Sequence, residues 1–201
     1  MRDDVMHVVS TGWRSLVFGL AAAVLYAASA FGQSMPLAER IQLCSACHGE
    51  DGNSRMENIP SLAGQPEFFI LNQLFLMREG VRRIEVMTPL VKDLKDDEMD
   101  ALAKHFAKLP PKASGEPVDP ALVTRGGELA AALRCGSCHL PTLAGQEQMP
   151  RLAKQRIDYM IHAMKEFRDD KRSGADTLMT SVVLGRSDAD LTALAHYAAS
   201  R

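Results

Sequence analysis

Residues 44–48 read CSACH and residues 135–139 read CGSCH, and these two stretches contain all four cysteines of the 201-residue chain. A second pair of segments repeats in the same order, because IPSLAGQ at 59–65 returns as MPRLAKQ at 149–155. The offset is 91 residues for the first pair and 90 for the second. An offset that stays nearly constant indicates duplication of one fold unit, so we expect two similar domains in tandem.

A proline-rich stretch separates the two copies. Residues 109–120 read LPPKASGEPVDP and hold four of the ten prolines of the chain. Proline lacks a backbone N–H and has a fixed φ, so this stretch can neither continue a helix nor pair as a strand. It is typical of an extended connector. We expect an N-terminal domain at 31–109, a linker at 110–120 and a C-terminal domain at 121–201.

The first thirty residues have the composition of an export signal. Residues 15–31 carry no charge, and the small residues Ala28-Ser29-Ala30 near their end have the form of a signal-peptidase site. We therefore expect residues 1–30 to be a signal peptide, cleaved near Ala30, and the remaining chain to be delivered across a membrane. An uncleaved N-terminal anchor is the alternative, because the uncharged run reaches the lower limit of a membrane span.

Both halves carry the residue spacing of helices. Apolar residues recur at three- and four-residue intervals, whereas an alternating β pattern is almost absent, which predicts an all-α fold. Ser187 with Asp190 three residues later resembles a helix N-cap, and acidic residues there suit the helix dipole. The expected helices cover 37–47, 67–79, 121–138 and 156–168, and a last helix in each half begins at Asp96 and at Ser187.

Three chemistries compete for the Cys-x-x-Cys-His motifs. A disulfide framework gives no role to the histidine that follows each pair. A zinc site could use two cysteine pairs, but it would leave both histidines and the duplication unexplained. Covalent haem attachment uses every position, because two thiols bond the vinyl groups of one porphyrin and the adjacent histidine lies under the iron. The sequence therefore predicts two covalently attached c-type haems, with attachment at Cys44, Cys47, Cys135 and Cys138 and proximal iron ligands His48 and His139.

A methionine thioether is the expected sixth ligand, and such a ligand raises the reduction potential of a haem. Met87 and Met179 are matched by the repeat, lie in expected loops between helices, and follow the proximal histidines by 39 and 40 residues. They are therefore the predicted distal ligands. Three further methionines lie within helical apolar stripes and are interpreted as core residues: Met77, Met160 and Met164.

Ligation by a second histidine is the alternative. His105 and His196 each follow a proximal histidine by 57 residues. The gapless alignment of the last helices, however, sets these two histidines one position apart, about 100° in phase, so they cannot share one structural role. We interpret them, together with His162, as residues at the edge of the core or on the surface.

Pro60 and Pro150 recur about a dozen residues after each motif. A turn proline is one interpretation of both positions. The functional interpretation is that a nearby backbone carbonyl accepts a hydrogen bond from Nδ1 of the proximal histidine, which would orient its ring and raise its basicity.

Several further segments carry a family resemblance: CSACHG with Asp51-Gly52-Asn53, IPSLAGQ, Gln73-Leu74 and Gly80 before Met87, and their counterparts in the second half. On these residues the chain resembles the di-haem class I cytochromes c of the cytochrome c4 type over essentially its whole mature length. This resemblance implies two class I cytochrome c domains with haem edges facing each other. It also implies a periplasmic carrier that passes electrons toward a terminal oxidase or a reductase.

Charge excludes one class of partner and suggests another. The net charge is −2, which lacks the electrostatic footprint of a nucleic-acid binder. Residues 36–109 carry a net charge of −3 and residues 121–201 a net charge of +2. The chain is therefore dipolar, and we expect salt-dependent encounters with charged redox proteins.

Three functions remain in competition. The first is a mobile electron carrier without a catalytic step. The second is a dedicated electron-accepting subunit of a periplasmic dehydrogenase that oxidises sulfide, thiosulfate or an alcohol. The third is a haem enzyme such as a di-haem peroxidase, which requires an open distal site. A matched methionine in both halves favours the electron-transfer functions over the enzyme.

Overall fold

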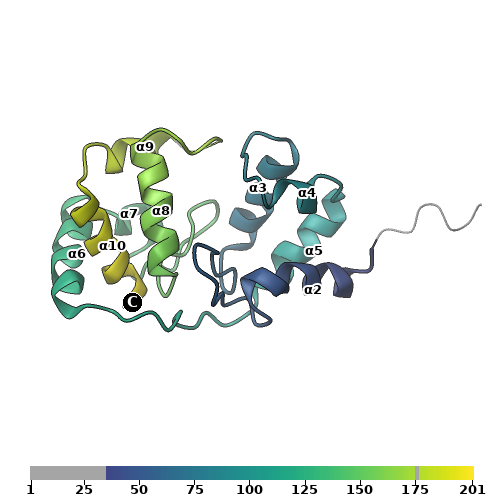
Figure 1. Ribbon diagram of the computed structural model, residues 1–201, viewed down its shortest axis with the longest axis horizontal. Coiled ribbons are helices and arrows are strands. Elements are labelled where there is room, and N and C mark those ends of the chain that lie inside the picture. Colours follow the sequence, from purple (N-terminus) through teal and green to yellow (C-terminus); the bar gives the residue numbers. More distant parts are fainter. Residues whose placement is uncertain (1–34, 175–176) are drawn as a thin grey trace, which may run out of the picture. The chain divides into compact units, whose positions relative to one another are not determined.

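The computed structural model describes residues 35–174 and 177–201, so the expected signal peptide at 1–30 lies outside the described residues. Leu37–Arg201 forms one compact unit (Figure 1). Within the described ranges the regular structure is helical, with one isolated bridge between Gln146 and Met149. This confirms the all-α prediction. No helix among these residues is long and apolar enough to cross a bilayer.

Among the residues that the structure describes, the first half contributes four helices, α2 to α5, which surround one apolar core. Glu98 in the first turn of α5 accepts a hydrogen bond from the Lys95 backbone N–H (2.9 Å), which fixes where that helix begins. Ile70 and Leu74 from α3 meet Leu102 and Phe106 from α5 in the core. The helices are α2 (Leu37–His48), α3 (Glu67–Arg78), α4 (Thr88–Val91) and α5 (Asp96–Ala107).

The second half repeats this arrangement with α6 to α10. Ser187 is the N-cap of α10, where its Oγ accepts from the Asp190 backbone N–H (3.1 Å), which confirms the predicted cap. The helices are α6 (Pro120–Ala132), α7 (Gly136–His139), α8 (Ile157–Arg168), α9 (Thr177–Val183) and α10 (Asp188–Ala199).

The prediction of one helix over 121–138 was wrong. The chain leaves the helix after Ala132, because Arg134 adopts a left-handed φ of 57° and its N–H bonds the carbonyl of Ala131. A separate short helix, α7, then carries the second cysteine motif. The first motif therefore lies at the end of one continuous helix, α2. The second motif lies on a separate short helix, α7, which follows α6.

Helices α6 and α10 cross at very close range, and Gly126 allows this. A Cβ at that position would lie 2.6 Å from the Ala193 carbonyl carbon and 2.7 Å from Tyr197 Cβ. Only a residue without a side chain fits between the two backbones. Ala130 of α6 with Leu191 and Leu194 of α10 forms the adjoining core cluster.

The proline-rich connector is extended from residue 110 to residue 119, and α6 begins at Pro120 rather than after it. Proline needs no hydrogen-bond partner at the first helical position, and the Asp119 side chain caps the helix by accepting from Ala121 N–H (2.8 Å). The connector is bonded to both halves. Asn53 Oδ1 accepts from Lys112 N–H (2.7 Å), and the Glu116 carboxylate accepts from the first backbone N–H groups of α8 (2.8 and 3.1 Å).

Candidate functional site

The first motif lies at the end of α2. Cys44 and Cys47 are half-buried and lie about one helical turn apart, so their thiols project to the same side of α2. His48 is the last residue of α2 and is only 7% exposed. The helix thus places two thiols and one imidazole within a single turn, as haem attachment requires.

A backbone carbonyl fixes the ring of His48. Its Nδ1 donates to the Pro60 carbonyl oxygen at 2.8 Å, which confirms the interpretation of this proline. The chain can turn back toward Pro60 because Gly49 has a φ of 89°, and a Cβ there would lie 2.8 Å from the Asn53 carbonyl carbon. With its proton on Nδ1, the ring offers its Nε2 lone pair to a metal.

The second motif reproduces this geometry on α7. Cys135 precedes the helix as its N-cap, Cys138 lies within it, and His139 ends it. His139 Nδ1 donates to the Pro150 carbonyl oxygen at 2.8 Å, the same distance as in the first half. Leu140 follows with a φ of 67°, so a leucine takes the left-handed position that a glycine occupies in the first half.

The electrostatics suit a neutral imidazole ligand in both halves. Burial lowers the pKa of His48 and of His139, and the carbonyl hydrogen bond opposes this shift. Burial also raises the pKa of the Cys44 and Cys135 thiols. All four cysteines are free thiols in the structure. Among the described residues, no group of three or more cysteine, histidine or carboxylate side chains gathers as a zinc site requires.

The two predicted distal methionines lie on the cores that carry the attachment cysteines. Met87 occupies the turn directly before α4 and packs, with Cys44, against the first core. Met179 packs, with Cys135, against the cluster between α6 and α10. Met179 does not lie in a loop as predicted. It lies within α9, whose two turns end before Gly185, a residue with a φ of 72°.

The three other histidines among the described residues have interactions elsewhere. His196 Nδ1 accepts from the Asp119 backbone N–H at 3.1 Å. His105 meets the ring of Phe106 edge-on, and His162 lies 3.5 Å from Glu166 on the exposed side of α8. These contacts fit the interpretation of all three as residues at the edge of the core or on the surface.

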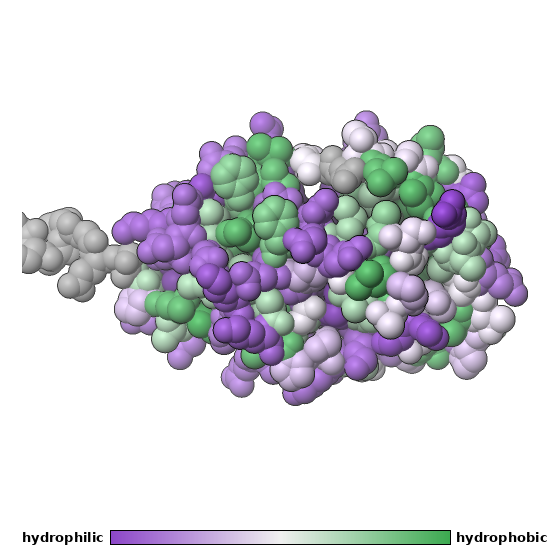
Figure 2. All heavy atoms as spheres, turned by 180° about the vertical axis from the view of Figure 1, so that it is seen from behind, coloured by the Kyte–Doolittle hydropathy of each residue, from purple (hydrophilic) through white to green (hydrophobic). Residues whose placement is uncertain are grey.

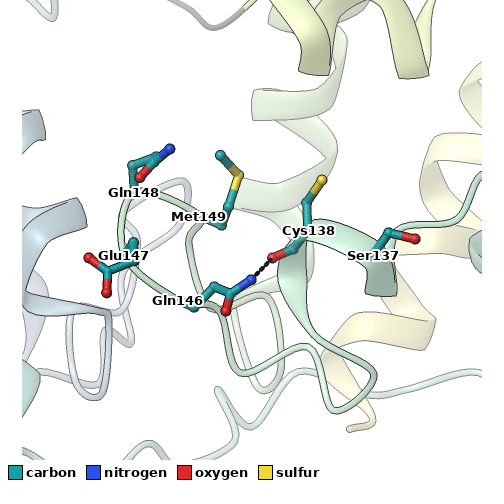
Figure 3. Close-up of a pocket in the computed structure, with 6 residues that line it drawn as sticks. All are labelled: Ser137, Cys138, Gln146, Glu147, Gln148 and Met149. Atoms are coloured by element: carbon teal, nitrogen blue, oxygen red, sulfur yellow. Dashed lines mark hydrogen bonds between the residues drawn. The ribbon is translucent and has the colours of Figure 1, made fainter.

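Apolar surface beside the motifs fits a porphyrin. An open surface depression of about 370 Å³ adjoins Cys138, and most of its lining is polar: Ser137, Gln146, Glu147 and Gln148. Figure 3 shows the Cys138 thiol, on α7, and the Met149 thioether, on the following loop, pointing toward the same side. Large apolar side chains next to predicted site residues are exposed, and a porphyrin would remove such surface from water: Leu43, Val86 and Leu178. Figure 2 shows several separate apolar groups on the face opposite that of Figure 1.

Two buried glutamines join the halves, and no function was predicted for them from the sequence. Gln65 accepts from the Arg151 N–H (2.9 Å) and donates to the Arg151 carbonyl (3.0 Å). Gln155 accepts from the Ser61 N–H (2.8 Å) and donates to the Ser61 carbonyl (2.9 Å). The available signal was their identical place in the repeat, IPSLAGQ and MPRLAKQ. The pairing is reciprocal, as at the interface of a twofold dimer.

Comparisons with known proteins agree with this geometry. The Cytochrome c family profile matches residues 123–200. Cytochrome c4 of Pseudomonas aeruginosa is 33% identical over 181 residues, which cover 85% of this chain and 89% of the relative. A thiosulfate dehydrogenase electron acceptor of Thiomonas intermedia is 32% identical over 200 residues, covering 94% and 91%. The crystal structure of reduced cytochrome c4 from Pseudomonas stutzeri superposes with a TM-score of 0.74 at 28% identity, covering 83% of this chain and 99% of that one.

Proposed function

This chain belongs to the cytochrome c4 family of di-haem cytochromes, and from that premise we propose that it is an exported, periplasmic electron carrier with one histidine and one methionine ligand at each iron. Two covalently attached haems are its cofactors, and when bound each would supply a one-electron ferric/ferrous couple. The observation that carries the proposal is the twofold occurrence of one arrangement: two thiols, a buried histidine and a proline carbonyl at 2.8 Å.

The proposal assigns a role to each site residue. The thiols hold the porphyrin, the imidazoles supply the proximal ligands through Nε2, and the thioethers supply the distal ligands. We assign attachment to Cys44, Cys47, Cys135 and Cys138, and iron ligation to His48, Met87, His139 and Met179.

The chain's own residues account for fast, reversible electron transfer. The Pro60 and Pro150 carbonyls hold the proximal rings in one orientation, so oxidation and reduction require little movement of the ligands. Burial lowers the pKa of both rings, which favours the neutral form that binds a metal. With a methionine on the distal side in both halves, no position is left for a substrate, and the proposal therefore assigns no catalytic step to this chain.

Absorption spectra of the oxidised and reduced holoprotein, with a haem count by pyridine haemochrome, test the proposal. We expect two haems per chain and the weak Fe(III)–methionine band at the red edge of the visible spectrum, at the intensity of two sites. Carbon monoxide should not bind the reduced protein. A band at half intensity, a high-spin signal or carbon monoxide binding would reveal an open iron and would refute the carrier function for that half.

A second candidate function is that of a dedicated electron acceptor for a dehydrogenase. The relative from Thiomonas intermedia, named a thiosulfate dehydrogenase electron acceptor, favours it. Stopped-flow reduction by a thiosulfate dehydrogenase with thiosulfate distinguishes the two. Rapid, salt-dependent reduction supports the acceptor function, because the halves differ in charge, at −3 and +2. Reduction no faster than that of an unrelated cytochrome c would contradict it.

A further inference from the structure

The peptide group between Pro60 and Ser61 is hydrogen-bonded at both ends. Its carbonyl oxygen accepts from His48 Nδ1 at 2.8 Å, and its N–H donates to Gln155 Oε1 at 2.8 Å. Gln155 belongs to the other half of the chain, and its amide makes two more bonds. Its Nε2 donates to the Ser61 carbonyl (2.9 Å), and its Oε1 also accepts from the Arg156 N–H of its own half (2.9 Å). One peptide therefore links the proximal histidine of the first half to a side chain of the second.

A corresponding link exists at the second site. The carbonyl of the Pro150–Arg151 peptide accepts from His139 Nδ1 at 2.8 Å, and its N–H donates to Gln65 Oε1 at 2.9 Å. Gln65 Nε2 donates to the Arg151 carbonyl at 3.0 Å. Both glutamines are at most 4% exposed, so water does not compete for these bonds.

We propose that Gln65 and Gln155 are positioning residues that each tune the proximal histidine of the opposite half. The inference rests on the proposed ligation of iron by His48 and His139. An amide that donates its N–H to an acceptor is more polarised, and its carbonyl becomes a stronger acceptor. A stronger acceptor at Nδ1 raises the basicity of the imidazole, which stabilises ferric iron. Gln155 thus lowers the reduction potential at His48, and Gln65 lowers it at His139.

The alternative, a purely structural function of the glutamines, predicts a different result. If the glutamines only held the halves together, removing one would affect both sites alike. The hydrogen-bond chain instead makes each glutamine act on one site, and that site is in the half to which the glutamine does not belong. The difference between the two reduction potentials is therefore the informative quantity, since a general loosening or a general electrostatic change largely cancels in it.

The test uses the holoprotein and its Gln155→Met variant, because methionine fills a similar volume without hydrogen-bonding to the Ser61 peptide. The two potentials are measured by a redox titration followed by NMR, with haem methyl signals assigned through contacts to residues of each half. At fixed applied potential, we expect the ratio of oxidised to reduced protein at His48 to fall roughly two- to fivefold. This fall equals a rise of roughly 20 to 40 mV at 59 mV per tenfold. The potential at His139 should stay unchanged.

Gln65→Met should give the corresponding result at the other site, with the rise in reduction potential confined to His139. Ser173→Ala is the matched control: it removes a bond between the halves, from Arg83 N–H to Ser173 Oγ (2.8 Å), that touches neither proline peptide. This control should shift neither potential. Equal shifts at both sites, or a shift in the half that carries the substitution, would overturn the proposal.

Gln155→Glu keeps an oxygen acceptor for the Ser61 N–H and serves as the conservative variant. In this variant, the reduction potential at His48 minus that at His139 should be equal to, or lower than, the same difference in the unaltered protein. Should the methionine variants not fold, a relative rise at His48 in Gln155→Glu refutes the inference. Failure of the proposed function is separate, because it would appear in the unaltered protein as a missing haem or a site without a reversible one-electron step.

Discussion

Replacing Gly126 by alanine tests the helix crossing that supports the second site. The added Cβ would lie 2.6 Å from the Ala193 carbonyl carbon and 2.7 Å from Tyr197 Cβ, whereas carbon atoms prefer a separation of roughly 3.5 Å or more. The obstacle is backbone, so α6 and α10 must separate by roughly 1 Å. Overpacking of this kind costs about 1–3 kcal/mol. The higher helix propensity of alanine offsets about 1 kcal/mol of that loss.

The neighbouring glycine supplies the matched control. A Cβ at Gly127 would meet the Tyr197 ring at 3.2 and 3.3 Å, and a ring at the end of a side chain can move aside. The helix-propensity gain should therefore dominate in Gly127→Ala. We expect Gly126→Ala to be less stable than Gly127→Ala by about 2 kcal/mol, or about 4–8 °C in Tm for a chain of this length.

Thermal and guanidinium unfolding of the two holoproteins measure this difference. The cluster beside the crossing also carries Cys135 and Met179, so Gly126→Ala should weaken the Fe(III)–methionine band of the second half first. Equal stability of the two variants would refute the close helix contact. Loss of stability without any change in that band would refute its connection to the site.

Further predictions concern the ligands, a helix cap and a surface ion pair. Met87→Ala and Met179→Ala should each remove about half of the Fe(III)–methionine absorption, and the double variant should remove all of it. Ser187→Ala should destabilise the holoprotein by about 1 kcal/mol in urea unfolding, because α10 loses its N-cap. A hydrogen bond from Lys112 lowers the pKa of Asp51 to about 2, below its value of about 3.9 in the unfolded chain. The pair therefore stabilises above pH of about 4, and this contribution, less than about 1 kcal/mol because the pair is exposed, is lost as pH falls through about 2. In acid titrations of stability, Asp51→Asn should lack that step.

The duplication made most of the fold predictable. Two copies of one motif at a nearly constant offset allowed each half to serve as a check on the other, and the proline carbonyls that bond His48 and His139 were found in this way. Local backbone geometry was harder to predict. The left-handed turn at Arg134 carries no glycine signal, so the sequence pattern predicts a helix that continues into the second motif. The short helix around Met179 was missed for a related reason, since its two turns are too few to show a periodic pattern.

The hydrogen bonds of the two glutamines could not be predicted from the sequence, for a different reason. Gln65 and Gln155 stood in the repeat, but their partners are backbone groups of the opposite half. A hydrogen bond to a backbone group does not depend on the type of the partner residue, so the sequence does not reveal it. Only the fold shows that a residue just after each proline meets the other half.

The connector has a consequence for the kinetics of electron exchange within one molecule. Domains joined by a free linker move relative to each other by default. Here Asn53 holds Lys112 near the start of the connector, Glu116 caps α8, and His196 accepts from Asp119 at the end. Because the connector is hydrogen-bonded along its length, the two haems do not have to be brought together by diffusion of the halves. Intramolecular transfer should therefore proceed at a rate that is insensitive to solvent viscosity, whereas exchange with an external partner should slow as the solution thickens.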